Sequence, residues 1–542
     1  MPMLGGRLPD GRPDEGGVRP YERVLRSRTG RGAVALLAGA LPALTFPAPS
    51  LWWFAYVALV PWMLLIRSAG TGRRAAADGW LGGMGFMLAV HQWLMPSLHV
   101  FIVVLAALLG LLWAPWGLLV SRLIGGSPSV RRSVAAVVVV PSGWLMIELV
   151  RSWEGLGGPW GLLGASQWDV PPALRVASVG GVWLVSLGVV AVNTAVVLLV
   201  AVEKARRTAV ACLLAGAVAV VSMVVWAPRP EETGSVRIAV VQPGVIEGPG
   251  SIERRFTRGE ELTRALAGRD VDLVVWGESS VGVDLSRSPA TADRVAALAR
   301  VVGADVLVNM DARRTDGPAR AGIYKSAVLV GPDGPTGDRY DKMRLVPFGE
   351  YVPARALLGW ATSVGKAAGE DRLRGSEPVV MDLPDGVRIG PLVCFESAFP
   401  DMSRQLAKDG AQVLVAQSST STFQHSWAPA QHASLGALRA AETGRPMVHA
   451  TLTGESAVYG PDGRRLGAPI GTDASEAAVY DVPLAEGTTL FVRLGAWPVY
   501  GALGVLAVFF GGAGLRSLRT PAPPPPGPPA RTAGGSPERP GH

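Results

Sequence analysis

The sequence predicts a multi-pass α-helical membrane domain joined to an α/β domain outside the cytoplasm. Three observations predict this division: seven long apolar runs within residues 33–227, short apolar strands alternating with helical segments within residues 228–488, and an eighth apolar run at residues 489–513. The 542 residues are 49% hydrophobic and only 17% charged, which is too apolar for an ordinary soluble protein.

The polar start of the chain, residues 1–32, contains seven arginines, and we expect a disordered basic cytoplasmic tail there. Each apolar run that follows approaches the roughly 20 residues needed to span a bilayer core. We therefore expect about seven transmembrane helices in residues 33–227 and a C-terminal one at residues 489–513. The runs lie at about 33–48, 51–67, 78–97, 101–121, 133–150, 178–201, 208–227 and 489–513.

The linkers between the runs predict the orientation. Basic residues cluster in every second linker and at the N-terminus, which under the positive-inside rule places both termini in the cytoplasm. We therefore expect a multi-pass protein of the cell membrane whose residues 228–488 are extracytoplasmic. The basic clusters are Arg67, Arg73 and Arg74; Arg122, Arg131 and Arg132; Lys204, Arg206 and Arg207; and Arg516 and Arg519.

The linker at residues 151–177 is rich in tryptophan and glycine. Because tryptophan favours the lipid–water interface, we interpret Trp153, Trp160 and Trp168 as membrane anchors rather than substrate contacts. His91 and His99 are also expected at the interface, since no metal-ligand spacing accompanies them.

The pattern from residue 236 onward is typical of a layered α/β domain. In such folds ligand-binding groups gather at the C-terminal ends of strands. The expected strands are 236–241, 271–276, 306–309, 326–330, 389–393, 413–416, 446–458 and 477–482, and the expected helices are 253–267, 290–302, 400–409 and 428–443.

A cysteine, a glutamate and a lysine occur at such positions. Cys394 directly follows the apolar run 389–393, Glu278 follows another strand, and Lys342 lies in a loop rich in proline and glycine. A carboxylate can take the proton of a thiol that attacks as a nucleophile. An ammonium group can lower the pKa of that thiol and stabilise an oxyanion. The other cysteine, Cys212, lies within an apolar run, so no disulfide is expected, and a packed core cysteine is the alternative interpretation of Cys394.

These segments resemble the nitrilase, or carbon–nitrogen hydrolase, superfamily. The run YDKMRLVPFGEYVP at residues 340–353, the segment GESS at 277–280 and the segment CFES at 394–397 resemble the membrane-fused branch, the apolipoprotein N-acyltransferase family. The resemblance covers about residues 33–513 and implies a nitrilase-like αββα sandwich. It assigns Glu278 as general base, Lys342 as the oxyanion-stabilising lysine and Cys394 as nucleophile, with Glu350 and Glu396 supporting the site.

The resemblance also implies the reaction. The family takes an acyl chain from a membrane phospholipid as a cysteine thioester, then passes it to the α-amino group of the diacylglyceryl-cysteine of apolipoproteins. The apolar residues after the signature run, Leu357, Leu358 and Trp360, are candidate lipid contacts. His432 and Arg439 are expected to belong to the domain scaffold, and no metal or organic cofactor is implied.

Three segments depart from the family pattern. Lys325 stands where the family usually has asparagine, residues 418–422 replace an Asn-Asp pair with aromatics, and Glu455 replaces an isoleucine. We interpret Lys325 as a bystander, so that Lys325→Ala is expected to be much milder than Lys342→Ala. The departures affect the expected substrate contacts but leave Glu278, Lys342 and Cys394 in place.

Two alternative functions remain open on the residues alone. The same three residues could hydrolyse C–N bonds in a membrane-tethered amidase, or the chain could be a non-catalytic scaffold for another envelope enzyme. A nucleic-acid partner is excluded, because the basic residues do not gather into one patch with interleaved aromatics. The proline-rich segment 514–542 is expected to be a disordered cytoplasmic tail.

Overall fold

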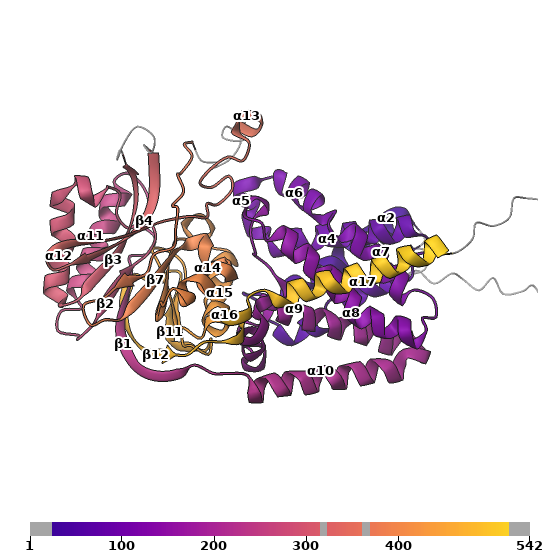
Figure 1. The fold of residues 1–542 in the computed structure, drawn as a ribbon. Helices are drawn as coiled ribbons and strands as arrows, with labels where there is room; N and C mark the ends of the chain where they lie inside the picture. Colours follow the sequence, from indigo (N-terminus) through magenta and orange to yellow (C-terminus); the bar gives the residue numbers. More distant parts are fainter. Residues whose placement is uncertain (1–23, 26, 315–321, 360–368, 520–542) are drawn as a thin grey trace, which may run out of the picture.

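The computed structural model describes residues 24–25, 27–314, 322–359 and 369–519. A bundle of helices forms one part of the molecule, and two β-sheets flanked by helices form the other (Figure 1). The long helices α10 and α17 run along the bundle and connect to the sheet-containing part at one end of it.

The eight apolar runs all form helices, several of them broken. Within the described residues, α8, α9 and the segment Glu203–Trp226 are long and apolar enough to cross a membrane, and the pair α6–α7, bent by 41°, makes a fourth if it is one span. The helices are α2 (Arg28–Ala40), α3 (Val60–Arg67), α4 (Gly72–Val90), α5 (Met95–Leu98), α6 (Phe101–Gly110), α7 (Trp113–Ile124), α8 (Val130–Arg151), α9 (Pro171–Ala201), α10 (Arg206–Trp226), α16 (Leu490–Leu494) and α17 (Trp497–Arg519).

Not every expected span is one continuous helix, because glycine and proline interrupt several runs. The last run breaks at Gly495, whose φ of +64° ends α16 before α17 begins. Pro61 lies at the first turn of α3, where proline is tolerated because the amide hydrogen there has no helical partner. Hydropathy alone does not distinguish such broken segments from continuous ones.

The boundaries of both expected tails are corrected by the structure. The helix α2 begins at Arg28, and its Arg31 is buried and paired with Asp78 of α4 at 2.6 Å. Burial of this charge is balanced by the carboxylate, so residues 28–32 belong to the helical domain. At the other end α17 continues to Arg519, and residues 1–23, 26 and 520–542 of the two tails lie outside the described residues.

The α/β part contains two six-stranded sheets, in the orders β12-β1-β2-β3-β4-β5 and β11-β10-β9-β8-β7-β6. Strands β1, β2 and β3 are parallel, as are β7, β8 and β9. The strands are β1 (Glu231–Gln242), β2 (Leu273–Trp276), β3 (Asp305–Arg314), β4 (Gly322–Gly331), β5 (Gly334–Asp341), β6 (Met381–Asp382), β7 (Arg388–Val393), β8 (Val413–Ser418), β9 (Met447–Thr451), β10 (Ser456–Tyr459), β11 (Arg465–Ile470) and β12 (Glu476–Glu486).

The alternation of side chains along the strands builds the layers. In β1, Ile238 and Val240 pack between the two sheets, whereas Ala239 and Val241 pack toward the helices on the outer face. The helices on the first sheet are α11 (Ser251–Arg264) and α12 (Pro289–Val302), and those on the second are α14 (Pro400–Lys408) and α15 (Ala428–Thr443). The short α13 (Arg355–Leu358) lies apart from these layers (Figure 1). The result is the αββα sandwich that the resemblance implied.

The strands that the sequence pattern does not predict are polar or sharply turned. The expected strand 446–458 is two antiparallel strands, β9 and β10, because Gly454 turns the chain with φ of +134°. The edge strands β5 and β11 have few apolar residues to reveal them, since one of their sides faces no further strand.

The linker at residues 151–177 joins the two parts of the molecule. The indole of Trp160 is buried and donates to Gln431 of α15 at 2.9 Å, so the anchor interpretation is wrong for this tryptophan, although Trp153 is exposed. Gly158, at φ of +69°, lies where an added Cβ would stand 2.6 Å from Phe395. The linker therefore packs directly against the turn that begins at Cys394.

A carboxylate of the α/β part also completes a break in the membrane domain. Gly180 and Gly181 interrupt α9, and the amide of Val182 beyond the break donates to Glu442 of α15 at 2.7 Å. Glu442 is itself paired with Arg439, which donates to the carbonyl of Ala398. This is the scaffold role expected of Arg439.

Candidate active site

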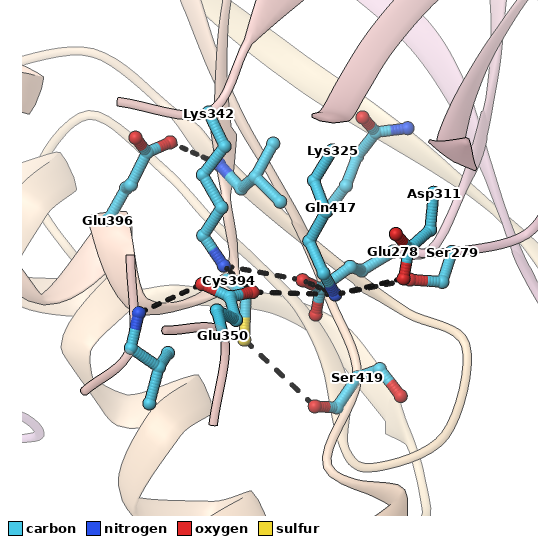
Figure 2. Close-up of polar contacts among 12 residues, drawn as sticks. Glu278, Ser279, Asp311, Lys325, Lys342, Glu350, Cys394, Glu396, Gln417 and Ser419 are labelled. Atoms are coloured by element: carbon cyan, nitrogen blue, oxygen red, sulfur yellow. Dashed lines mark hydrogen bonds and ion pairs between the residues drawn. The ribbon is translucent and has the colours of Figure 1, made fainter. Parts of the chain in front are cut away.

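Cys394 lies at the end of β7, where the chain turns sharply. Its φ of +52° lies in the left-handed region, which a residue other than glycine rarely adopts, and the helical turn η9 (Cys394–Ala398) starts there. The thiol contacts the carbonyl oxygen of Ser419 at 4.0 Å (Figure 2). The nearby His432 lies 3.0 Å from the carbonyl oxygen of Cys394 and 3.1 Å from the hydroxyl of Ser397, so it supports the turn.

Glu278 lies at the end of β2, in the opposite sheet. The strand end fits closely against the second sheet, because a Cβ on Gly277 would stand 1.9 Å from the amide of Leu452. The amide of Glu278 donates to the carbonyl of Ser418 at 3.1 Å, and that of Ser279 donates to Asn309 at 2.9 Å. The backbone at Glu278 is therefore held from both sheets, by the carbonyl of Ser418 and by the side chain of Asn309.

Lys342 follows β5 and is completely buried. Its ammonium donates to Glu350 at 2.7 Å and to Glu278 at 3.4 Å (Figure 2). The second oxygen of Glu350 accepts from the amide of Val346 at 2.8 Å, which closes the signature loop on itself. The structure thus brings together the three residues expected to be catalytic and one of the two expected to support them.

Glu396 joins the loop of Lys342 to the turn of Cys394. One of its oxygens accepts from the hydroxyl of Tyr340 and from the amides of Met343 and Arg344, at 2.8, 2.7 and 3.0 Å. The other oxygen accepts from the amide of Val393 at 2.8 Å. This buried carboxylate therefore sets the distance between the lysine and the cysteine.

Replacing Glu396 with glutamine is expected to destabilise the protein by about 2 kcal/mol or more. The amide group has one accepting oxygen, so at least one of these buried donors loses its partner. The thermal unfolding midpoint of the purified protein in detergent should fall, compared with Glu377→Gln at an exposed position. Equal midpoints for the two variants would contradict this role of Glu396.

Lys325 does not lie apart from the site, as the interpretation of it as a bystander requires. Lys325 lies in β4, and its ammonium donates to Glu278 at 2.8 Å and lies 3.4 Å from Glu350. Its register explains this placement, because the amide of Lys342 donates to the carbonyl of Lys325 at 2.8 Å. The site therefore contains two ammonium groups and two carboxylates.

Burial and charge together set the protonation of the site. Burial alone would raise the pKa of Glu278, but Lys325 and Lys342 lower it to about 2. Burial, followed by the charge of Glu278, raises the pKa of the Cys394 thiol to about 12. The expectation of a lowered thiol pKa is therefore wrong, because burial and the carboxylates outweigh the lysines. At neutral pH the resting pair is a thiol beside a carboxylate.

Two polar residues beneath the site, Gln417 and Asn309, are not among those that the sequence pattern predicts. Gln417 of β8 donates across the sandwich to the carbonyls of Trp276 and Leu307, at 2.8 and 3.2 Å. The side-chain amide of Asn309 donates to Gln417 at 3.3 Å. The only signal in the sequence was that both residues interrupt or end an apolar strand.

The candidate lipid contacts follow the signature run. Leu357 and Leu358 lie in α13, and Trp360 lies outside the described residues. Ser418 belongs to one of the segments that depart from the family pattern. Its backbone carbonyl accepts hydrogen bonds from the amides of Glu278 and Leu452. The carboxyl of Glu455 has a raised pKa because it is largely buried.

Comparisons with known proteins cover both parts of the chain. Residues 38–195 match the family described as apolipoprotein N-acyltransferase N-terminal domain, and residues 237–490 match carbon-nitrogen hydrolase. The chain is 30% identical over 503 residues to the apolipoprotein N-acyltransferase of Geobacter metallireducens, covering 88% of this chain and 95% of the relative. It is 27% identical to the enzyme of the same name from Photobacterium profundum, covering 87% and 92%. Among solved structures, an amidase from Nesterenkonia sp. aligns with a TM-score of 0.34 and 21% identity, over 47% of this chain and 92% of the amidase.

Proposed function

Because the chain belongs to the apolipoprotein N-acyltransferase family, we propose that it acylates the N-terminus of lipoproteins through a thioester on Cys394, with a membrane phospholipid as acyl donor. The chain is an acyltransferase with a nitrilase-type catalytic domain and a membrane-integral helical domain. The observation that supports the proposed site is the contact of one carboxylate, Glu278, with the ammonium groups beside Cys394.

In the first half-reaction Glu278 takes the proton of Cys394 as the sulfur attacks the carbonyl carbon of a phospholipid ester. Lys342 stabilises the negative charge that forms on the carbonyl oxygen. The intermediate then collapses, the ester C–O bond breaks, and the lysophospholipid leaves with the proton held by Glu278. The acyl chain remains on the sulfur as a thioester.

In the second half-reaction the α-amino group of a diacylglyceryl-cysteine attacks the thioester. Glu278 takes a proton from the nitrogen, the C–S bond breaks, and the thiolate is reprotonated by Glu278. The products are an amide on the lipoprotein and the free thiol of Cys394. Water in place of the amine would give the hydrolysis expected of an amidase.

The arrangement of the two domains supports an extracytoplasmic site. The start of α10 and the end of α17 lie at the end of the bundle away from the sheets (Figure 1). Arg206 is the first residue of α10, and Arg516 belongs to the last turn of α17. Basic residues favour the cytoplasmic side of a membrane. We therefore place residues 228–488 outside the cytoplasm, next to the outer leaflet and its lipids.

Incubation of the purified protein with phospholipid alone is expected to add one acyl chain to Cys394. Mass spectrometry of the peptide that contains Cys394 checks this, and neutral hydroxylamine should remove the chain, because thioesters are labile to it. Adding a diacylated lipopeptide should then discharge the thioester and give a triacylated product. An acyl chain on another residue would contradict the assignment, and release of free fatty acid without transfer would indicate a hydrolase.

A further inference from the structure

The site contains a second lysine, Lys325, beside Lys342. Lys325 and Lys342 are brought side by side by the β4–β5 ladder, where the amide of Lys342 donates to the carbonyl of Lys325. Figure 2 shows both side chains directed toward Glu278 and Glu350.

The two ammonium groups divide the two carboxylates between them. Lys325 is closer to Glu278, at 2.8 Å, and Lys342 is closer to Glu350, at 2.7 Å. The two crossed pairs are each 3.4 Å apart. The nearest cation to the proposed base is therefore Lys325, not Lys342.

A third carboxylate faces Lys325 from the outer side. Asp311 of β3 lies 3.9 Å from its ammonium, and the guanidinium of Arg372 lies 3.2 Å from Asp311. Because Arg372 is the closer partner of Asp311, Lys325 remains directed to Glu278. The hydroxyl of Ser279 accepts a further hydrogen bond from Lys325 at 3.3 Å.

We propose that Lys325 is a positioning residue that fixes the carboxylate of Glu278 beside Cys394 and keeps it ionised. This inference rests on the proposed function, because it assigns Glu278 the part of general base. It leaves Lys342 free to serve the acyl oxygen, since Lys325 supplies the positive charge that the buried Glu278 requires. A buried carboxylate without such a partner favours its protonated form, which cannot accept the thiol proton.

The charges around Glu278 determine the sign of the pH effect. The groups that face it are Lys325, Lys342, Glu350 and Cys394, with Asp311 behind Lys325. Burial would raise the pKa of Glu278, and Lys325 is the largest of the opposing contributions. Removing this charge therefore raises the pKa of Glu278, and the base becomes protonated at a higher pH than in the wild type.

Lys325→Gln removes the charge and keeps a hydrogen-bond donor, whereas Lys325→Arg keeps the charge. In Lys325→Gln we expect the rate of Cys394 acylation by phospholipid to fall about 10-fold at pH 7, and the acid limb of its pH profile to move up by about one pH unit or more. Lys325→Arg should restore the position of the acid limb. Lys408→Gln, on the exposed side of α14, is the matched control. Should Lys325→Gln not fold, Lys325→Asn has the same expected result.

A second readout separates this inference from the proposed function. The rate of Cys394 alkylation by iodoacetamide also depends on proton transfer to Glu278, but it needs neither phospholipid nor lipoprotein. If the wild type forms no acyl adduct, the proposed function fails, while a shifted alkylation profile in Lys325→Gln still supports the positioning role. Superimposable profiles of Lys325→Gln and the wild type in both assays, or equal losses in Lys325→Gln and Lys325→Arg without a shift of the acid limb, would overturn it.

Discussion

Replacing Cys394 with serine is expected to reduce acyl transfer by a factor on the order of 10⁴ or more. The reason lies in the protonation of the site. The pKa of Glu278 is held at about 2, so this carboxylate is a weak base, and it can remove a proton only as the sulfur forms its bond to carbon. A serine hydroxyl is far less acidic than a thiol, and the same base cannot activate it.

The experiment compares Cys394→Ser with Cys212→Ser, since Cys212 is the other free cysteine and lies in α10. The triacylated product formed from phospholipid and a diacylated lipopeptide is measured by mass spectrometry. Cys212→Ser should retain wild-type activity and its thioester, and Cys394→Ser should lose both. Activity of Cys394→Ser above about one hundredth of the wild type would show that the sulfur is not the acyl acceptor.

The position of Cys394 could be predicted because it depends on a short-range pattern. An apolar strand followed by a polar turn is visible in the residues Ile389–Val393 and Cys394, and the same holds for β2 and Glu278. That the two strands belong to different sheets could not be derived from this pattern. The two sheets meet where Gln417 donates to the carbonyl of Trp276 and where Gly277 lies against the amide of Leu452. Both contacts join residues that are far apart in the sequence and meet only in the folded sandwich.

The role of Lys325 could not be predicted, because it depends on register. A lysine in a strand is usually directed to solvent, and one residue of slippage would place it on the other face of the sheet. The pairing of β4 with β5 places Lys325 next to Lys342, and β5 itself is a polar edge strand that the sequence does not reveal. The burial of Trp160 is hidden from the sequence for a related reason, since its partner Gln431 is 271 residues away.

Replacing Lys342 with methionine is expected to reduce acylation by roughly 10²- to 10³-fold, the effect of losing one preorganised oxyanion donor. It should also destabilise the protein by roughly 3–5 kcal/mol, because the two buried carboxylates, Glu278 and Glu350, would then share the single ammonium of Lys325. The double variant Lys342→Met/Glu350→Gln removes the uncompensated charge as well. It should recover most of the stability and none of the activity.

The double variant separates the two parts that Lys342 plays. Thermal unfolding in detergent measures stability, and single-turnover transfer of a fluorescent acyl chain to Cys394 measures the chemical step. If acylation returned together with stability, Lys342 would serve only to neutralise Glu350, and the oxyanion would need another donor. The nearest candidate would then be Lys325, whose ammonium lies 3.4 Å from Glu350. A larger loss in Lys342→Met than in Lys325→Gln is therefore the comparison that assigns one lysine to the acyl oxygen and the other to the base.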